Sequence, residues 1–152
     1  MNSPRTLDRD GIAARIPHRG TMCLLDGLLG WSDDTIHCRA SGHADPAHPL
    51  RGPQGLLAPC AIEYAAQAMA LHGALAAPGG GAARPGFLAS ARQVRLHVAR
   101  LDDVPGALQV HAVRLAGDGH QALYRFTLQD EAGRTLVEGR AAVVFDSPLS
   151  AA

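Results

Sequence analysis

The hydrophobic residues in the second half of the chain alternate with polar ones. This alternation recurs at residues 94–98, 108–112 and 122–128, and residues 135–145 form a further strand-like run after Gly133. A period of two places successive side chains on opposite faces of a sheet, so each run predicts a half-buried strand. Asp118-Gly119 and Gly133 lie between the later runs and are typical of tight turns. The chain after Gly86 therefore predicts about four antiparallel strands joined by short turns.

The first half of the chain contains one strong helix. Residues 23–40 form two extended runs around Ser-Asp-Asp, which predicts a hairpin. Residues 41–59 are rich in Pro and Gly and predict a long irregular loop, a feature that is usually functional or disordered. From Cys60 to Ala77, apolar side chains cover every face of the predicted helix, which indicates burial on all sides. Residues 78–81, Pro-Gly-Gly-Gly, end it.

This order of elements predicts an α+β protein. A helix that is apolar all round is not stable on the surface of a monomer. An antiparallel sheet of about six strands wrapped around one long buried helix would cover most of it, and a second copy of the sheet would cover the remainder. That arrangement is the hotdog fold, which is normally dimeric. We expect one domain over residues 1–152, with residues 1–16 as an arm or short helix before Pro17 and residues 146–152 as a frayed tail.

The composition indicates a globular protein and excludes several functions. The 152 residues are 47% hydrophobic and 18% charged, and the formal net charge is zero. This balance argues against nucleic-acid binding through bulk electrostatics. All 14 basic residues are Arg. The absence of Lys excludes Schiff-base chemistry, a Walker lysine and Lys-dependent pyridoxal phosphate catalysis. A chain rich in Arg, Ala and Gly also indicates a GC-rich bacterial coding bias.

The cysteines and apolar runs indicate a reduced, cytoplasmic protein. Cys23, Cys38 and Cys60 have no Cys-x-x-Cys spacing and cannot all pair internally, and no secretion signal is visible. No uninterrupted apolar run approaches the roughly 18 residues of a membrane span. No cluster of His, Cys or carboxylate residues has metal-ligand spacing, so we expect neither a metal nor a cofactor.

Glu63 is the most informative candidate for chemistry. It lies in the first turn of the apolar helix, where desolvation of a carboxylate is costly without a partner or a purpose. Gln67, four residues later, lies on nearly the same face and can hydrogen-bond to it. A glutamate that only stabilises the helix N-terminus is the structural alternative.

The long loop supplies two histidines that could act as a base. His48 is followed by Pro49, which stiffens its backbone, and His43 lies five residues earlier. Solvated surface positions are the alternative for both. His72 lies nine residues after Glu63, about half a turn around the helix from it, and should not share its site.

Two further features have structural interpretations beside the functional ones. Cys60 lies at the helix N-terminus, where a thiolate would be stabilised, but a small buried apolar residue is the favoured interpretation. Arg92, Arg95 and Arg100 could form a basic strip for a phosphate-bearing carrier, or a solvated face of a strand.

Three segments resemble a known enzyme family. Residues 16–26, IPHRGTMCLLD, resemble the L-P-H-R-x-P-x-L-L-V-D opening of bacterial 3-hydroxyacyl-acyl carrier protein dehydratases. Residues 63–67, EYAAQ, resemble the E-x-x-A-Q start of the helix in that family. Residues 94–106 resemble the strand, turn and Pro-Gly that follow. The sequence of residues 61–68 is similar to that of a divergent branch of dehydratase-like proteins, which are found beside fatty-acid or polyketide-type clusters.

The resemblance implies a site shared by two subunits. In the family, a loop histidine removes the α-proton of a 3-hydroxyacyl thioester on acyl carrier protein, and the helix carboxyl group assists departure of the β-hydroxyl as water. Backbone N–H groups at the helix N-terminus polarise the thioester carbonyl. Glu63 matches the glutamate. His48 precedes it by fifteen residues, against fourteen in the family, whereas Gly42-His43 matches the family dipeptide but lies twenty residues away. His18 matches a position that we interpret as structural.

The departures from the family pattern leave other functions open. Ala58-Pro59-Cys60 replaces the Pro-Gly that supplies an N–H group, and divergent members can lack the histidine. We expect a dehydratase-like enzyme that works as a homodimer or with a related hotdog subunit, through Glu63 and His48. A tunnel along the helix, lined by residues such as Ile62, Met69 and Phe87, should hold the acyl chain. The alternatives are a hotdog thioesterase, or a degenerate acyl-binding or partner subunit.

Overall fold

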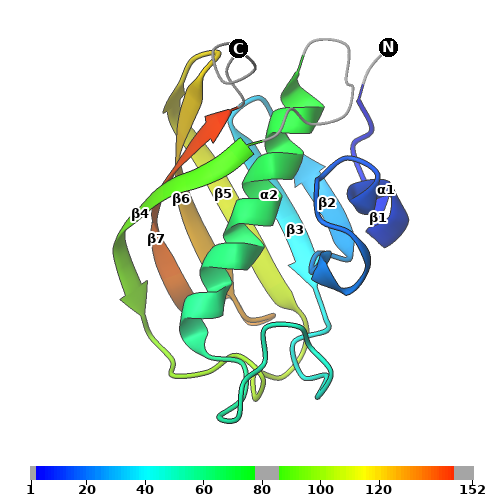
Figure 1. Ribbon diagram of the computed structural model, residues 1–152, viewed down its shortest axis with the longest axis vertical. Helices are drawn as coiled ribbons and strands as arrows, with labels where there is room; N and C mark the ends of the chain where they lie inside the picture. The colour runs from blue at the N-terminus through cyan, green and yellow to red at the C-terminus, as the bar shows by residue number, and fades with distance from the viewer. Residues whose placement is uncertain (1–2, 78–85, 146–152) are drawn as a thin grey trace, which may run out of the picture.

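A computed structural model describes residues 3–77 and 86–145 of the chain. The described residues form one antiparallel sheet of seven strands in the order β1-β2-β3-β5-β6-β7-β4, and Figure 1 shows helix α2 lying across one face of this sheet. The strands are β1 (Leu7–Asp8), β2 (Gly27–Trp31), β3 (Thr35–Ala40), β4 (Gly86–Leu96), β5 (Leu108–Gly117), β6 (Gln121–Gln129) and β7 (Thr135–Phe145). This confirms the hotdog arrangement.

The strands that the alternation predicts are present. Buried and accessible side chains alternate along β6, and β5 and β6 are joined at a turn in which Asp118 accepts hydrogen bonds from the N–H groups of His120 and Gln121. The expected hairpin is formed by β2 and β3. The additional strand β1 is only two residues long and pairs with β2, which is why a window-based pattern does not reveal it. It leads into the short helix α1 (Arg9–Ala13), capped by Asp8.

Helix α2 (Ala61–Ala76) is the centre of the core. Its buried residues include Tyr64, Ala68 and Leu71, which pack against the inward-facing side chains of the strands. A single-turn helix, η2 (Ala58–Cys60), precedes α2. Pro59 is tolerated in this first turn but has no backbone N–H group to donate, so the helix does not extend further toward the N-terminus. Residues 78–81, expected to end the helix, lie outside the described residues, as does the expected tail at 146–152.

One stripe of α2 is only half-buried in the single chain. It consists of Ile62, Glu63, Ala66, Ala70 and Gly73. These positions recur at helical spacing, so they form one face of α2 that the chain's own sheet does not cover. The chain's own sheet thus covers most of α2 but not this stripe, in line with the expectation that one chain alone does not bury the whole helix.

Strand β4 forms one edge of the sheet and is largely accessible. It pairs with β7 on one side, and within the described sheet no strand pairs with its other side. Phe87 is 67% exposed, and Leu88 and Leu96 are also exposed. A long edge strand with exposed apolar side chains is a site at which another chain can add a strand.

A buried polar network fixes α2 to the sheet. His72 Nδ1 lies 2.7 Å from the Tyr124 hydroxyl, and His72 Nε2 lies 2.8 Å from the Ser32 carbonyl oxygen. Since the carbonyl only accepts, Nε2 carries the proton and the Tyr124 hydroxyl donates to Nδ1. Burial lowers the pKa of His72, which favours this neutral form. His72 thus lies away from Glu63, as expected.

Removing the hydroxyl of Tyr124 should destabilise the fold. In Tyr124→Phe, the lone pair of His72 Nδ1 remains buried without a donor, a loss worth about 1–3 kcal/mol. Urea unfolding of the variant and the wild type measures the difference in free energy of unfolding. An unchanged midpoint with an unchanged slope would contradict the role of this network.

The described residues contain no helix that is long and apolar enough to cross a membrane. All three cysteines, Cys23, Cys38 and Cys60, are free thiols.

Candidate active site

Glu63 lies in the first turn of α2 and is held by two side chains. His18 Nε2 is 3.0 Å from Glu63 Oε1, and the Gln67 amide nitrogen is 3.2 Å from the same oxygen. The contact with Gln67 was expected from the spacing of four residues on a helix. About one third of the Glu63 side chain stays accessible, 33% by exposed fraction. Within the described residues the second oxygen, Oε2, has no hydrogen-bond partner.

Gln67 is fully buried and cannot turn its amide group. Its oxygen accepts the N–H of Leu24 at 2.9 Å, and its nitrogen donates to the carbonyl of Met22 at 2.7 Å. The segment after η1 (Gly20–Met22) is therefore attached to α2 directly beside Glu63. These two bonds fix which end of the Gln67 amide faces the carboxylate.

The carboxyl group of Glu63 is ionised at neutral pH. The hydrogen bond from His18 is the largest influence and lowers the pKa of Glu63, and the bond from Gln67 and the charge of His18 lower it further. Desolvation acts in the opposite direction but is outweighed. Glu63 therefore acts as a hydrogen-bond acceptor at neutral pH and not as a proton donor.

His48 is buried and bonded within its own subunit. Its Nδ1 accepts the N–H of Leu50 at 3.1 Å, and its Nε2 lies 2.9 Å from the Tyr64 hydroxyl. Because Nδ1 is occupied as an acceptor, Nε2 carries the proton and donates to Tyr64. Desolvation lowers the pKa of His48, which keeps the ring neutral. Within one chain, its hydrogen bonds go to Tyr64 and Leu50 and not to Glu63.

His43 connects two loops. Its Nε2 lies 2.8 Å from the carbonyl oxygen of Val104, and the side chain is 2% exposed, against 8% for His48. Neither loop histidine points to solvent, although a solvated position was the structural alternative for both.

Sequence reasoning did not find the partners of these groups. His18 was interpreted as structural, yet it contacts the carboxylate of Glu63 directly. Tyr64, which contacts His48, was not among the candidate residues. The Pro17-His18-Arg19 motif was the available signal for His18, but nothing in the spacing indicates that a loop 45 residues away lies against α2.

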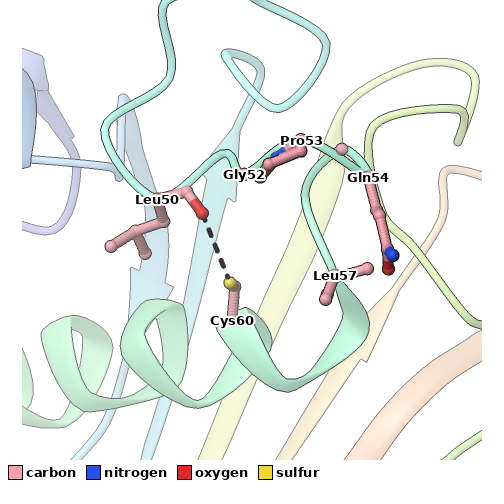
Figure 2. A pocket seen from close by; sticks show the side chains of 7 residues that line it. Leu50, Gly52, Pro53, Gln54, Leu57 and Cys60 are labelled. Atoms are coloured by element: carbon pink, nitrogen blue, oxygen red, sulfur yellow. Dashed lines mark hydrogen bonds between the residues drawn. The ribbon is translucent and has the colours of Figure 1, made fainter.

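An apolar pocket of about 230 Å³ lies over the start of α2. Its lining residues are Leu50, Gly52, Pro53, Gln54, Gly55, Leu57 and Cys60. Figure 2 shows the Cys60 side chain directed from the helix toward the carbonyl of Leu50, with the sulfur 3.9 Å from that oxygen. Burial raises the pKa of the Cys60 thiol, which favours the apolar interpretation of this residue over a reactive thiolate.

The expected tunnel along the helix does not match the positions of its residues in one chain. Met69 is packed in the core, whereas Phe87 is exposed on β4. The two therefore do not line one cavity within the subunit.

The backbone before α2 is already hydrogen-bonded. The N–H of Cys60 donates to the carbonyl of Leu57 at 3.0 Å, and the N–H of Ala61 donates to the carbonyl of Ala58. These N–H groups donate hydrogen bonds within the single-turn helix η2. They are therefore not free to polarise a thioester carbonyl, which is the role that the resemblance implied for this segment.

The expected arginine strip is replaced by a different row. Arg100 is bonded to Asp102 at 2.6 Å, and Arg95 lies opposite Glu138 in the register of β4 and β7. Arg92, however, lies opposite Arg140 on β7, which in turn lies opposite Arg125 on β6. These three exposed side chains, which we call the arginine row, have no carboxylate partner within the described residues.

The described residues contain no group of three or more His, Cys, Asp or Glu side chains that could hold a metal ion. On the outer face of the sheet, His37 and His111 stack with ring centroids 4.1 Å apart, but they form only a pair.

An antiparallel sheet around a central helix, with a partly accessible carboxylate in the first turn of that helix, defines a hotdog protein. Residues 11–151 match the family model described as ApeP-like, ApeP dehydratase. The chain therefore belongs to the ApeP-like family of dehydratases. No curated protein sequence matches it significantly.

Several solved structures share the fold of this chain. The dehydratase heterocomplex ApeI:P from Xenorhabdus doucetiae matches with a TM-score of 0.75 and 24% identity, over 91% of this chain and 92% of that one. A thioesterase from Haemophilus influenzae matches with a TM-score of 0.66 and 13% identity, over 98% and 97%. AziG from S. sahachiroi matches with a TM-score of 0.59 and 15% identity, over 78% and 88%. At these identities the similarity concerns the fold.

Proposed function

We propose that the protein dehydrates a 3-hydroxyacyl thioester to the enoyl thioester and water, in fatty-acid or polyketide-type synthesis. The observation that carries this proposal is Glu63: an ionised, accessible carboxylate in the first turn of a buried helix, with Oε2 free of partners among the described residues. A fixed, ionised carboxylate that keeps one oxygen free can accept a hydrogen bond from a reacting hydroxyl. Membership of a dehydratase family gives that function its chemical class.

The proposed reaction uses Glu63 and His48. His48 accepts the α-proton, which leaves an enolate thioester, and the imidazolium then gives this proton to the β-hydroxyl. The carbon–oxygen bond breaks, the double bond forms, and water leaves. Glu63 accepts a hydrogen bond from the hydroxyl and orients it. For this step, the His48 ring must exchange its contact with Leu50 or Tyr64 for the substrate.

The two groups meet, in this proposal, between two subunits. His48 and Glu63 each bond to other partners within one chain, which supports an arrangement in which they face one site from different chains. The half-buried stripe of α2 and the unpaired edge of β4 are the surfaces that a second subunit would cover. The partner is a second copy or a related hotdog subunit, as in the ApeI:P heterocomplex.

The acyl chain fits the apolar pocket over the start of α2. Leu50, Pro53 and Leu57 line it, and the pocket also contains Cys60, one turn before Glu63. An apolar pocket that begins one turn from the carboxylate suits a chain attached to the reacting carbons. We place the reaction in the cytoplasm, where the three free thiols stay reduced.

The substrate is proposed to arrive on acyl carrier protein, and the arginine row is the surface that supports this. Like charges directly opposite each other on neighbouring strands repel. Three unpaired guanidinium groups in one row therefore suit an acidic partner or a phosphate-bearing arm.

Arg140→Ala removes the middle of the arginine row and should weaken carrier binding. We expect the KM for a carrier-bound substrate to rise by roughly threefold to tenfold at low salt, and the KM for a short thioester to stay unchanged. The effect should shrink as salt screens the charges. Arg134→Ala, an exposed arginine near the start of β7, is the matched control. Equal KM values for Arg140→Ala and the control would remove this surface from the proposal.

The function itself is tested by following the product of the wild-type protein. A 3-hydroxyacyl thioester is supplied, the enoyl thioester is measured by its absorbance, and free thiol is measured separately. Enoyl product without thiol supports a dehydratase. Thiol release without enoyl product would establish a thioesterase instead, and a folded protein with neither product, also in the presence of a hotdog partner, would favour a non-catalytic subunit.

A further inference from the structure

We propose that His18 is a positioning residue for Glu63: it binds one carboxylate oxygen and leaves the other to face the substrate. This inference rests on the proposed function, in which Glu63 is the reacting carboxylate. It assigns a role to a residue that lies outside the His48–Glu63 pair.

The contact between His18 and Glu63 is short, and both its donor atom and its acceptor atom can be identified. His18 Nε2 lies 3.0 Å from Glu63 Oε1. An ionised carboxylate only accepts hydrogen bonds, so Nε2 must carry a proton and donate it. Gln67 donates to the same oxygen at 3.2 Å. Oε1 therefore receives two donors, and the free oxygen is Oε2.

The loop that carries His18 is built to hold it in place. Arg19 donates from its guanidinium to the carbonyl of Ala13 at 2.6 Å and to that of Ile16 at 2.8 Å. Ile16 is itself buried in the core. The backbone on both sides of His18 is thus fixed, and Pro17 removes further freedom.

The other ring nitrogen of His18 shows that the ring serves Glu63 alone. Nδ1 is buried and has no hydrogen-bond partner within the described part of the chain. In the Nε2–H tautomer this atom is a bare lone pair. The one bonded nitrogen of the ring, Nε2, is therefore aimed at Oε1 of Glu63.

Within residues 3–77 and 86–145, no titratable side chain other than His18 contacts the carboxylate of Glu63. From the loop after α1, His18 is the titratable group in contact with it. From α2 itself the contact is the neutral amide of Gln67, and the segment 22–24 binds that amide through its backbone. Among the described residues, no Arg and no second carboxylate contacts Glu63. The ionisation of Glu63 should therefore respond to His18 directly.

Two substitutions separate positioning from a structural role. His18→Phe keeps the ring volume but removes the donor, whereas His18→Gln keeps an N–H at a similar reach. For His18→Phe we expect kcat to fall by about 10–100-fold with little change in KM, because only the placement of the reacting group changes. For His18→Gln we expect kcat within about threefold of wild type.

The pH dependence gives a readout that a loss of stability would not produce. The hydrogen bond from His18 lowers the pKa of Glu63, so its removal raises that pKa. A carbon-13 titration of the Glu63 carboxyl group should show this rise in His18→Phe, and a smaller rise in His18→Gln, which keeps the donor but not the charge of His18.

A similar His–Glu pair elsewhere supplies the control. His97 Nε2 lies 2.8 Å from Glu138 on the outer face of the sheet, and His97→Phe should change neither kcat nor the titration of Glu63. If Glu63→Gln abolishes turnover but His18→Phe changes neither kcat nor the pKa of Glu63, the positioning role is wrong and the proposed function stands. If turnover survives Glu63→Gln, the assignment of Glu63 fails. In that case a raised pKa of Glu63 in His18→Phe would show that His18 contacts Glu63 but that the contact has no role in catalysis.

Discussion

Replacing Glu63 by glutamine is expected to lower kcat for dehydration by about 10²–10³-fold, because the charged acceptor that orients the leaving hydroxyl is lost. The amide oxygen of glutamine can still accept the hydrogen bonds from His18 and Gln67. The fold should therefore be preserved. What is lost is the negative charge and the free carboxylate oxygen that faces the hydroxyl of the substrate.

The control for this variant is Glu138→Gln. Glu138 is also an accessible glutamate that contacts a histidine, but it lies on β7, and its partner there is His97. Its substitution should leave kcat within about twofold of wild type, as for a surface change. A Glu63→Gln protein with wild-type kcat and an unchanged melting temperature would contradict the assignment.

His48→Gln is expected to reduce kcat by a similar factor, about 10²–10⁴-fold. Glutamine can accept the N–H of Leu50 through its oxygen and donate to Tyr64 through its nitrogen, but it has no basic nitrogen. Since desolvation lowers the pKa of His48, the neutral base persists below the usual histidine range. The wild-type acid limb of kcat/KM should therefore lie below pH 6.5, the ordinary value for His48.

His43→Gln is the matched variant, since it keeps an N–H donor for the carbonyl of Val104. We expect it to retain most of its activity. Turnover that survives in His48→Gln and is lost in His43→Gln would transfer the role of base to His43. Turnover that survives in both would exclude the loop histidines.

The fold could be predicted from the sequence because its signals are local. Alternation along β6 and the fully apolar segment of α2 each define an element within a short window. The spacing of Glu63 and Gln67 on one helix predicted their contact for the same reason. Strand β1 was missed because two residues are too few to show a period.

The contacts of the site could not be predicted because they depend on how distant segments meet. His18 reaches Glu63 through a loop whose path is set by core packing and by the bonds of Arg19. The arginine row depends on the register of β4, β7 and β6, which alternation within one strand does not define. Which ring nitrogen of His48 carries the proton depends on the backbone N–H of Leu50 and on the hydroxyl of Tyr64.

The central claim is that Glu63 and His48 from two subunits form one dehydration site. Its most direct test is the activity of mixed dimers. The test uses the form of the protein that has been shown to turn over the 3-hydroxyacyl thioester. Glu63→Gln and His48→Gln chains are co-expressed with different affinity tags, and dimers carrying both tags are isolated. In such a dimer no chain holds both residues, but one of the two interfacial sites does.

Production of enoyl thioester by the mixed dimer is the measurement. We predict about half of the wild-type kcat per dimer, because one of two symmetric sites is intact, while each parent variant alone stays nearly inactive. Activity of the mixed dimer no higher than that of the parents would contradict a site shared between subunits.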